Sequence, residues 1–463
     1  MTIANPRHCF LLLAFALIFG GGCAVLPNVA QQIDETPTAR QPRQIVSSKG
    51  LLSTKQSQKI MARLQQSVDP TDILGRHSVV VESVTDSPLT KGNKVTLLAD
   101  GEATYAAMFD AMEKAQDHIN LESYIVEDDE IGRKFADLLL KKQAAGVQVN
   151  LSYDSVGSMY TPAVFFQRLR DGGIRVVEFN PMNPMEARGE WRLTQRNHRK
   201  ILLADGRVGI IGGINISKVY SSSPFKRNKE EPLPIHWRDT DVQIEGPAVA
   251  ELQKLFLETW RKQEGSVLTD RDYFPELQEQ GNALVRVVGS TPGETNRIPF
   301  VMYVSAIIFA ENSIHLTHSY FIPDDQILKA LVDTARRGVD VKIILPGTSD
   351  SPWPLHAQRH HYSALLKAGV KLYEHETSLL HAKTAVIDQV WSTVGSTNLD
   401  YLSLLNNDEV NAVILSREFA VEMEEMFASD LADSRQIHWE DWKKRPWLPR
   451  IREWFVNLFG RWL

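Results

Sequence analysis

Cysteine is scarce in this sequence. The 463-residue chain contains two, Cys9 and Cys23, and none follows Cys23. A disulfide framework and a cysteine-rich metal site are therefore both excluded from the body of the chain. Chemistry in that body has to come from other side chains.

An excess of basic residues is also missing. The formal net charge is −6 and the isoelectric point is about 6.1. Proteins that bind nucleic acid usually carry a strong basic excess, so this balance disfavours a nucleic-acid partner without excluding a local basic cleft. Hydrophobic content of 43% and charged content of 23% are typical of a globular protein with a large core.

The N-terminal apolar run is too short to span a bilayer comfortably. It covers the eleven residues 9–19, after Arg7 and before the glycines 20–22 and Cys23. This order is typical of an export signal, and the small residues before Cys23 resemble a bacterial lipoprotein processing site. We predict that residues 1–23 are a lipoprotein-type signal and that Cys23 becomes lipid-modified. A plain signal or an uncleaved anchor is the alternative.

Two kinds of segment are expected in residues 24–94. Residues 24–50 contain several prolines and no sustained apolar period, which predicts a tether. A helix is expected from Ser53, as N-cap, to about Gln66.

From residue 95 the sequence repeats itself. INLESYIVEDDEIG (119–132) parallels IHLTHSYFIPDDQIL (314–328), and AAGVQVNLSYD (144–154) parallels RRGVDVKIILP (336–346). Strand-like and helix-like segments alternate in both copies, which predicts an internal duplication with an α/β fold. The two repeats are expected at 95–280 and 281–435.

Each repeat carries the same motif: His-x-Lys, an Asp five residues later, and a Gly-rich turn that ends in Asn. One copy would be a weak signal, but two copies with the same tail are a strong one. The members are His198, Lys200, Asp205, Gly213 and Asn215 in the first repeat, and His381, Lys383, Asp388, Ser396 and Asn398 in the second.

The motif residues have the chemistry that a phosphate ester requires. On a strand, His and Lys two positions apart share a face, so each imidazole lies beside a positive charge. One His can act as nucleophile while the other serves as acid and then base. Asn215, Asn398 and Ser396 are candidates to support the phosphate, although the asparagines could instead shape turns. Asp205 and Asp388, counted with the catalytic motif, are placed to hold the turns.

The doubled motif resembles that of the phospholipase D superfamily, and the chain is most similar to bacterial cardiolipin synthases, in which Gly at the position of Gly213 is common. The resemblance covers about residues 95–435. It implies two repeats, each a mixed sheet flanked by helices, packed face to face about a pseudo-twofold with one shared active site. It also implies a phosphohistidine intermediate, with no metal or other cofactor, and His198 as the attacking residue. In this family an acidic residue binds the imidazole of its own motif, which assigns Asp239 to His198 and Glu409 to His381.

Tryptophan is concentrated in the tail, residues 436–463. Half of the ten tryptophans lie there, with apolar side chains at helical spacing and basic residues around them. This pattern predicts an amphipathic helix lying in a membrane interface. A helix packed on the core or on a second subunit is the alternative.

Two further features have open interpretations. His356 and His360, at helical spacing, could bind a metal, but without a suitable carboxylate a polar helix face is favoured. The charged, proline-bearing stretch 218–236 is either a lid or a surface insertion.

Together these features predict a membrane-associated phosphatidyltransferase that makes cardiolipin from lipids such as phosphatidylglycerol. The alternatives are a phospholipase D that yields phosphatidic acid, a nuclease of the same superfamily, and a lipid-binding protein with a degenerate site. The expected partners are phospholipids and a bacterial membrane, with no nucleic acid. Cys23 would anchor the protein in the envelope; Val25, which is not acidic, mildly favours the outer membrane. The sequence determines neither the donor and acceptor lipids nor the oligomeric state.

Overall fold

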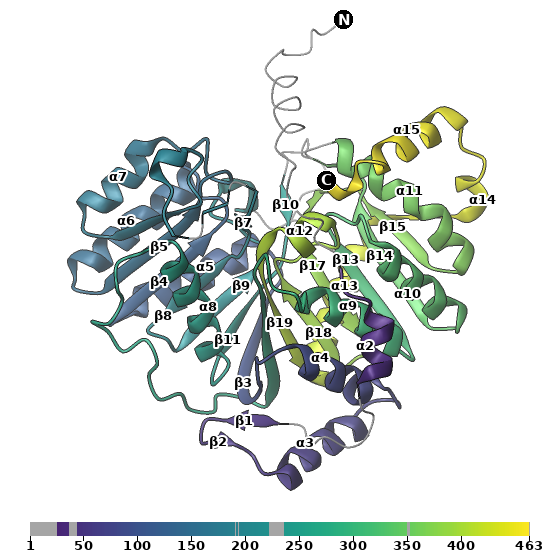
Figure 1. Ribbon diagram of the computed structural model, residues 1–463, viewed down its shortest axis with the longest axis horizontal. Coiled ribbons are helices and arrows are strands. Elements are labelled where there is room, and N and C mark those ends of the chain that lie inside the picture. Colours follow the sequence, from purple (N-terminus) through teal and green to yellow (C-terminus); the bar gives the residue numbers. More distant parts are fainter. Residues whose placement is uncertain are drawn as a thin grey trace, which may run out of the picture.

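The computed structural model describes residues 26–36, 44–189, 191–192, 194–221, 236–349 and 352–462. Two α/β halves lie side by side, and their central strands meet in the middle of the molecule (Figure 1). The predicted signal with Cys23 and most of the stretch 218–236 lie outside the described residues.

The duplication is visible in the order of elements. The first half contains β3 (Leu89–Leu98), α5 (Gly101–Lys114), β4 (His118–Ser123), α6 (Glu130–Ala144), β5 (Gln148–Asp154), α7 (Ala163–Asp171), β6 (Arg175–Phe179), η2 (Pro184–Glu186), β7 (Arg196–Asn197), β8 (Ile201–Ala204), β9 (Val208–Gly212), η3 (Lys218–Tyr220), β10 (Trp237–Arg238), β11 (Asp241–Glu245) and α8 (Val249–Lys262). The second half contains β12 (Ala283–Ser290), α9 (Ile298–Phe309), β13 (Ser313–His318), α10 (Asp325–Arg336), β14 (Asp340–Pro346), α11 (Pro352–Ala368), β15 (Lys371–His375), β16 (Leu379–Leu380), β17 (Lys383–Ile387), β18 (Trp391–Gly395), α12 (Tyr401–Leu405), β19 (Asn407–Leu415), α13 (Arg417–Ala432) and β20 (Ser434–Ile437).

The strands of the two halves follow the same order. In the first half, neighbours run β6-β5-β4-β8-β9-β11-β3, with parallel pairs at the β6 end and antiparallel pairs elsewhere. In the second half they run β15-β14-β13-β17-β18-β19-β12 with the same directions, and β20 is added beside β15. Antiparallel pairing of β3 with β12 joins the halves. The predicted mixed sheet flanked by helices is confirmed for each repeat, and the pairing of β3 with β12 makes the two sheets continuous.

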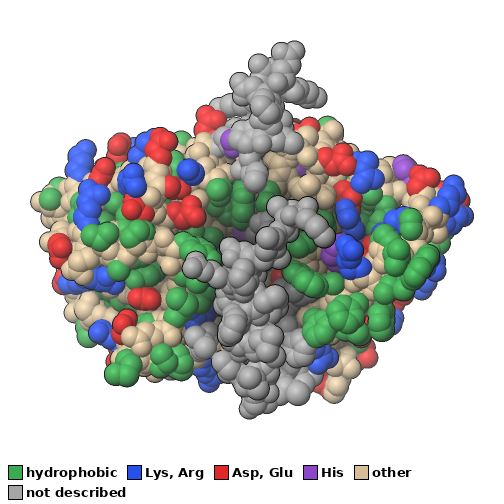
Figure 2. Space-filling view, turned by 90° about the horizontal axis from the view of Figure 1, so that it is seen from above, with side chains coloured by type: hydrophobic (Ala, Val, Ile, Leu, Met, Phe, Trp, Pro, Cys, Tyr) green, Lys and Arg blue, Asp and Glu red, His purple; other side chains and the backbone are tan. Residues whose placement is uncertain are grey.

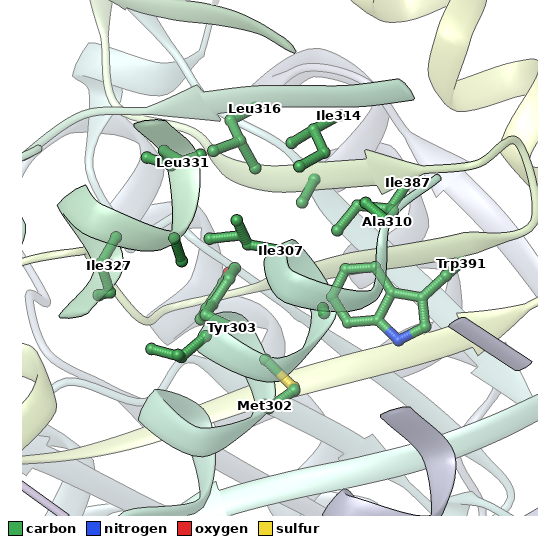
Figure 3. Packing of buried hydrophobic residues seen from close by; sticks show 14 of the residues in the cluster. Met302, Tyr303, Ile307, Ala310, Ile314, Leu316, Ile327, Leu331, Ile387 and Trp391 are labelled. Atoms are coloured by element: carbon green, nitrogen blue, oxygen red, sulfur yellow. The ribbon is translucent and has the colours of Figure 1, made fainter. Parts of the chain in front are cut away.

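The halves also pack face to face, as expected. Buried apolar side chains of β9 and β11, among them Ile211 and Val242, share one cluster with Val394 of β18 and Val410 of β19. A second cluster surrounds α9, which is apolar on all sides and buried (Figure 3). A helix of that kind has to lie inside the protein. The hydrophobic core therefore continues across the boundary between the halves.

The N-terminal segment differs from the predicted tether. It contains α2 (Val29–Glu35), β1 (Ile45–Ser47), β2 (Gly50–Leu51), α3 (Thr54–Gln66), the π-helical turn η1 (Ile73–His77) and α4 (Ser78–Val84). Val29 and Ile45 are buried in the core of the second half, so part of residues 24–50 belongs to the folded body. The helix expected from Ser53 to Gln66 is confirmed, with Ser53 and Gln56 forming a capping box.

The tail is folded onto the second half. It forms α14 (Trp439–Trp442), α15 (Trp447–Asn457) and a 3-10 turn, η5 (Gly460–Trp462). Val456 of α15 is buried against Ala357 of α11, and Arg445 forms an ion pair with Glu453 at 2.7 Å. The predicted tail helix therefore packs on the core through one side. Across the described residues, no helix is both long and apolar enough to cross a membrane.

Candidate active site

Each motif histidine is held by the backbone of the other half. The short strand β7 pairs in parallel with β19, and the His198 amide donates to the Asp408 carbonyl at 2.9 Å. In the same way β10 pairs with β16, and the His381 amide donates to the Arg238 carbonyl at 2.7 Å. These two equivalent crossings bring both motifs to one place, at the top centre of Figure 1.

The acidic partners are exchanged between the halves. Nδ1 of His198 lies 3.0 Å from the Glu409 carboxylate, and Nδ1 of His381 lies 2.6 Å from that of Asp239. The expected assignment of each acid to its own motif is therefore wrong. A carboxylate only accepts hydrogen bonds, so each Nδ1 carries the hydrogen and each Nε2 is left with a lone pair. That is the form a nucleophilic imidazole requires.

The two lysines lie against the histidines. Nζ of Lys200 donates to the His198 carbonyl at 2.6 Å. Nζ of Lys383 donates to the His381 carbonyl and lies 2.9 Å from Nδ1 of the same residue. Both ammonium groups are buried, within a site that also holds two carboxylates. In the empty site the carboxylates of Asp239 and Glu409 therefore offset the charge of the two ammonium groups.

Burial dominates the electrostatics of the site. It lowers the pKa of Lys200 to about 7 and also lowers the pKa of Lys383. Burial, assisted by Lys383, lowers the pKa of His381 to about 4, and burial lowers that of His198 as well. Both imidazoles are therefore neutral near pH 7 when the site holds no phosphate.

The acids remain ionised for a different reason. Burial alone would raise the pKa of Asp239, but Lys383 and His381 together bring it below its usual value. Burial likewise acts to raise the pKa of Glu409, but His198, Lys200 and Ser396 together bring it below its usual value. Each imidazole therefore faces a charged carboxylate, which stabilises the imidazolium whenever the ring takes up a proton.

The Gly/Ser difference between the motifs has a steric cause. A Cβ at position 213 would collide with the carboxylate of Asp239. At the equivalent position of the second half, the Ser396 hydroxyl donates to Glu409 at 2.5 Å. The register of β9 with β11 and of β18 with β19 makes Asp239 the counterpart of Glu409. Gly213 thus leaves room for the acid that binds His381.

The two asparagines are used differently. Asn215 accepts from the Ile125 amide at 3.0 Å and donates to the Tyr220 hydroxyl at 3.1 Å, so its side chain ties the turn to its neighbours. Asn398 accepts from the Ser319 hydroxyl at 2.8 Å. Both line the cavity beside the histidines. Contact of either side chain with phosphate stays a prediction.

The motif aspartates lie at the far ends of their strands. Asp205 accepts from the backbone amides of residues 116–118 at 2.8 to 3.0 Å. Asp388 accepts from those of residues 311–313 and from the Thr71 hydroxyl. Both have positive φ, as turn residues do. The prediction that Asp205 and Asp388 hold the turns that follow β8 and β17 is therefore confirmed, and counting them among the catalytic residues is wrong.

A cavity of about 350 Å³ opens over both histidines. Its lining includes Tyr124, Ile125, Arg196, His198, Asn215, Trp237, Tyr320, Pro354, His381, Asn398, Asp400, Leu402, Ser403 and Asn407. The Tyr124 ring lies 5.1 Å from that of His198, and the Trp237 ring lies 4.9 Å from that of His381. We did not predict these aromatic residues. A signal was present for the tyrosines, because Ser-Tyr occurs at matching places in both repeats, at 123–124 and 319–320.

The histidine cluster on α11 has neighbours in the tail. His360 and His361 stack edge to face at 5.2 Å, and Nε2 of His361 lies 3.1 Å from the Asn457 side chain. The expected polar helix face therefore lies partly under α15. Within the described part of the chain, no group of three or more His, Cys, Asp or Glu is arranged to hold a metal ion.

The sequence matches the family described as "Cardiolipin synthase, PLD-like domain" over residues 108–260 and 303–431. It is 33% identical over 414 residues to a cardiolipin synthase of Alkalihalophilus pseudofirmus, covering 88% of this chain and 80% of that one. It is 36% identical over 369 residues to one of Geobacillus thermodenitrificans, covering 79% and 72%. It is also 34% identical over 392 residues to cardiolipin synthase 1 of Bacillus anthracis, covering 82% and 75%.

Among solved structures, the phosphatidylserine synthase of Haemophilus influenzae has a similar fold. The TM-score is 0.60, with 87% of this chain and 97% of that chain covered. Identity is 12%, so this likeness concerns the fold alone.

Proposed function

Because the chain belongs to the cardiolipin synthase family of phospholipase D-like proteins, we propose that it joins two phospholipids into cardiolipin through a phosphatidyl-histidine enzyme. The chain is a phosphatidyltransferase, and phosphatidylglycerol is the proposed donor. One observation carries the proposal. Both histidines line a single cavity, each with Nδ1 held by a carboxylate of the opposite half.

In the first step, Nε2 of His198 attacks the donor phosphorus. The bond between phosphorus and the glycerol headgroup breaks, and the leaving oxygen takes a proton from Nε2 of His381. His381 has to be protonated beforehand. Entry of the anionic phosphodiester favours the imidazolium, and Asp239 stabilises it.

In the second step, His381 acts as the base. Its neutral Nε2 takes the proton from a hydroxyl of the acceptor phosphatidylglycerol, whose oxygen attacks the same phosphorus. The phosphorus–nitrogen bond breaks, cardiolipin leaves, and His198 is free again. The second step thus restores the proton that His381 lost in the first.

Lys200 and Lys383 would stabilise the charge that develops on the phosphoryl oxygens. They are pre-positioned ammonium groups in a site largely shielded from water, where electrostatic stabilisation is strongest. Asn398 and Asn215 would contribute amide donors at the cavity wall.

We further propose that the enzyme works at a bacterial membrane, anchored through Cys23. Support comes from the position of the residues that follow it. Gln326, at the start of α10, binds the Pro27 carbonyl and the Val29 amide, both at 2.9 Å. Cys23 is thus four residues from a point fixed on the folded body, so a lipid at Cys23 would hold the body close to the bilayer. The outer membrane remains the preferred location.

The proposal is tested with full-length protein and vesicles of phosphatidylglycerol, with or without phosphatidylethanolamine, and products read by mass spectrometry. We expect cardiolipin plus free glycerol, absent with the His198→Asn variant. Phosphatidic acid in place of cardiolipin would contradict transfer and indicate a phospholipase. Absence of any lipid product, with cleavage of a nucleic-acid phosphodiester, would contradict a lipid substrate.

A further inference from the structure

The outer side of α15 presents an unusual amount of apolar surface. Trp447 is 65% exposed, Leu448 is 63% exposed and Trp454 is 54% exposed. The other large apolar side chains that are exposed here are Ile451, Phe455, Leu458 and Phe459. Contiguous exposed apolar surface on a folded protein marks a place of interaction. We call these seven residues the α15 surface.

Positive charge surrounds the α15 surface. Between Glu440 and Trp462 the chain has six basic and three acidic residues, whereas the whole protein has a net charge of −6. Lys443 pairs with Glu440 at 2.5 Å, and Lys444 lies 4.0 Å from Asp441. The third acid, Glu453, is buried and paired with Arg445, while Arg450 and Arg452 are exposed. Apolar side chains rimmed by Lys and Arg complement a bilayer that carries anionic headgroups.

The buried side of the helix that carries the α15 surface packs beside the catalytic cavity. Val456 packs with Ile322 and Ala357. These residues follow Tyr320 and Pro354 by two and three positions, and both Tyr320 and Pro354 line the cavity. The Arg461 guanidinium lies 5.6 Å from the ring of Tyr401, which precedes the cavity residue Leu402. Three segments of the cavity wall therefore hold the tail in place.

The space-filling view agrees with this arrangement. Figure 2 shows the face that is uppermost in Figure 1, where α15, α11 and α12 lie. Hydrophobic side chains gather on the right of this face, over the half that carries α15, with basic side chains nearby.

We infer that the α15 surface docks on an anionic phospholipid bilayer and holds the cavity mouth against the lipid. This inference rests on the proposed function, because it explains how a cavity lined by Leu402 and Trp237 receives lipids that stay in a membrane. It adds the partner surface and the orientation. Docking does not require lipidation of Cys23, because the apolar side chains enter the interface themselves.

The first experiment reads insertion at single positions. The only two cysteines, Cys9 and Cys23, are replaced by Ser in the full-length chain, which also removes the lipidation site. A polarity-sensitive fluorophore is attached through Ile451→Cys or, as control, through Leu51→Cys, on β2 at the bottom of Figure 1 and 62% exposed. With phosphatidylglycerol vesicles we expect a blue shift and quenching by nitroxide lipids at position 451 and neither at position 51.

Two outcomes would overturn the inference. One is an unchanged probe at position 451 while the protein sediments with the vesicles. The other is a blue shift at position 451 that depends on protein concentration and needs no lipid, which would mean that a second copy covers the surface.

The second experiment separates docking from catalysis. The double variant Trp454→Ser, Phe455→Ser should bind vesicles with an affinity at least about tenfold lower. Its turnover of vesicle lipid should fall in proportion. It should turn over short-chain phosphatidylglycerol, present as monomers, at the unsubstituted rate; Leu51→Ser should change neither. Equal loss on both substrates would contradict docking. If the unsubstituted protein acts on neither vesicle nor short-chain phosphatidylglycerol, the proposed function is wrong. The fluorophore at position 451 then still tests whether the α15 surface docks on the bilayer.

Discussion

The carboxylate of Asp239 lies 2.6 Å from Nδ1 of His381, a residue of the other half of the molecule. The reciprocal pair, Glu409 and His198, lies at 3.0 Å. Neither half therefore contains a complete histidine–acid pair of its own. The duplicated chain forms one site because each copy supplies the acid for the other.

The first prediction concerns these exchanged pairs. Glu409→Gln should alter the side-chain ¹⁵N chemical shifts of His198, and Asp239→Asn those of His381, because each substitution removes the negative charge that faces one Nδ1–H. Turnover should fall roughly 10²- to 10⁴-fold in both, the usual range for loss of acid–base function. Nuclear magnetic resonance of ¹⁵N-histidine-labelled protein makes the comparison. If Asp239→Asn changed the ¹⁵N chemical shifts of His198 and left those of His381 unchanged, the acid would be paired with the histidine of its own motif, which would contradict the exchange.

Gly213 provides the second prediction. In Gly213→Ala the new Cβ would displace the Asp239 carboxylate, so kcat should fall at least about tenfold through disturbance of His381. The matched change Ser396→Ala removes one hydrogen bond to Glu409 and creates no collision, so its effect should be smaller. Steady-state kinetics of the two variants side by side tests this order. A milder effect of Gly213→Ala than of Ser396→Ala would contradict the steric account.

Much of this site was predictable from sequence, and the exchange was not. The His-x-Lys pairs are close in the chain, so strand geometry alone places the members of each pair together. The partner of His381 depends instead on the pairing of β10 with β16. These strands have two residues each and come from opposite halves, so no sequence pattern predicts that they pair. Similarly, residues 24–50 resemble a tether in composition, yet Val29 and Ile45 are buried because the second half offers an apolar surface to them.

The third prediction assigns the motif aspartates to stability. Asp205→Ala leaves three backbone amides without their acceptor, which should lower the free energy of unfolding by roughly 2–5 kcal/mol. Asp388→Ala should cost at least as much, because it also releases Thr71 of the N-terminal segment. Urea unfolding measures both. Activity per folded molecule should stay near that of the unsubstituted protein. A loss of catalytic activity in a fully folded variant would show that the aspartate takes part in the reaction.

The fourth prediction concerns pH. Burial depresses the pKa of Lys200 to about 7, so the ammonium loses its proton as pH rises through that value in the empty site. Sulfate, whose own charge stays constant over this range, should inhibit competitively and bind more weakly above pH 7 than below it. Inhibition constants measured from pH 5.5 to 9 test this, with Lys200→Met as the control that should show weak binding throughout. If inhibition by sulfate does not change with pH, the pKa of Lys200 must lie well above 7, which would contradict this prediction.

The most direct test of the central claim, two histidines with separate roles in one site, uses a phosphatidyl ester of p-nitrophenol. This leaving group departs without a proton donor. His381→Asn should therefore release about one equivalent of p-nitrophenol per enzyme, stop, and carry a phosphatidyl group on His198 that peptide mass spectrometry detects. His198→Asn should release none. Continued turnover by either variant, or a burst from His198→Asn with the adduct on His381, would contradict the account.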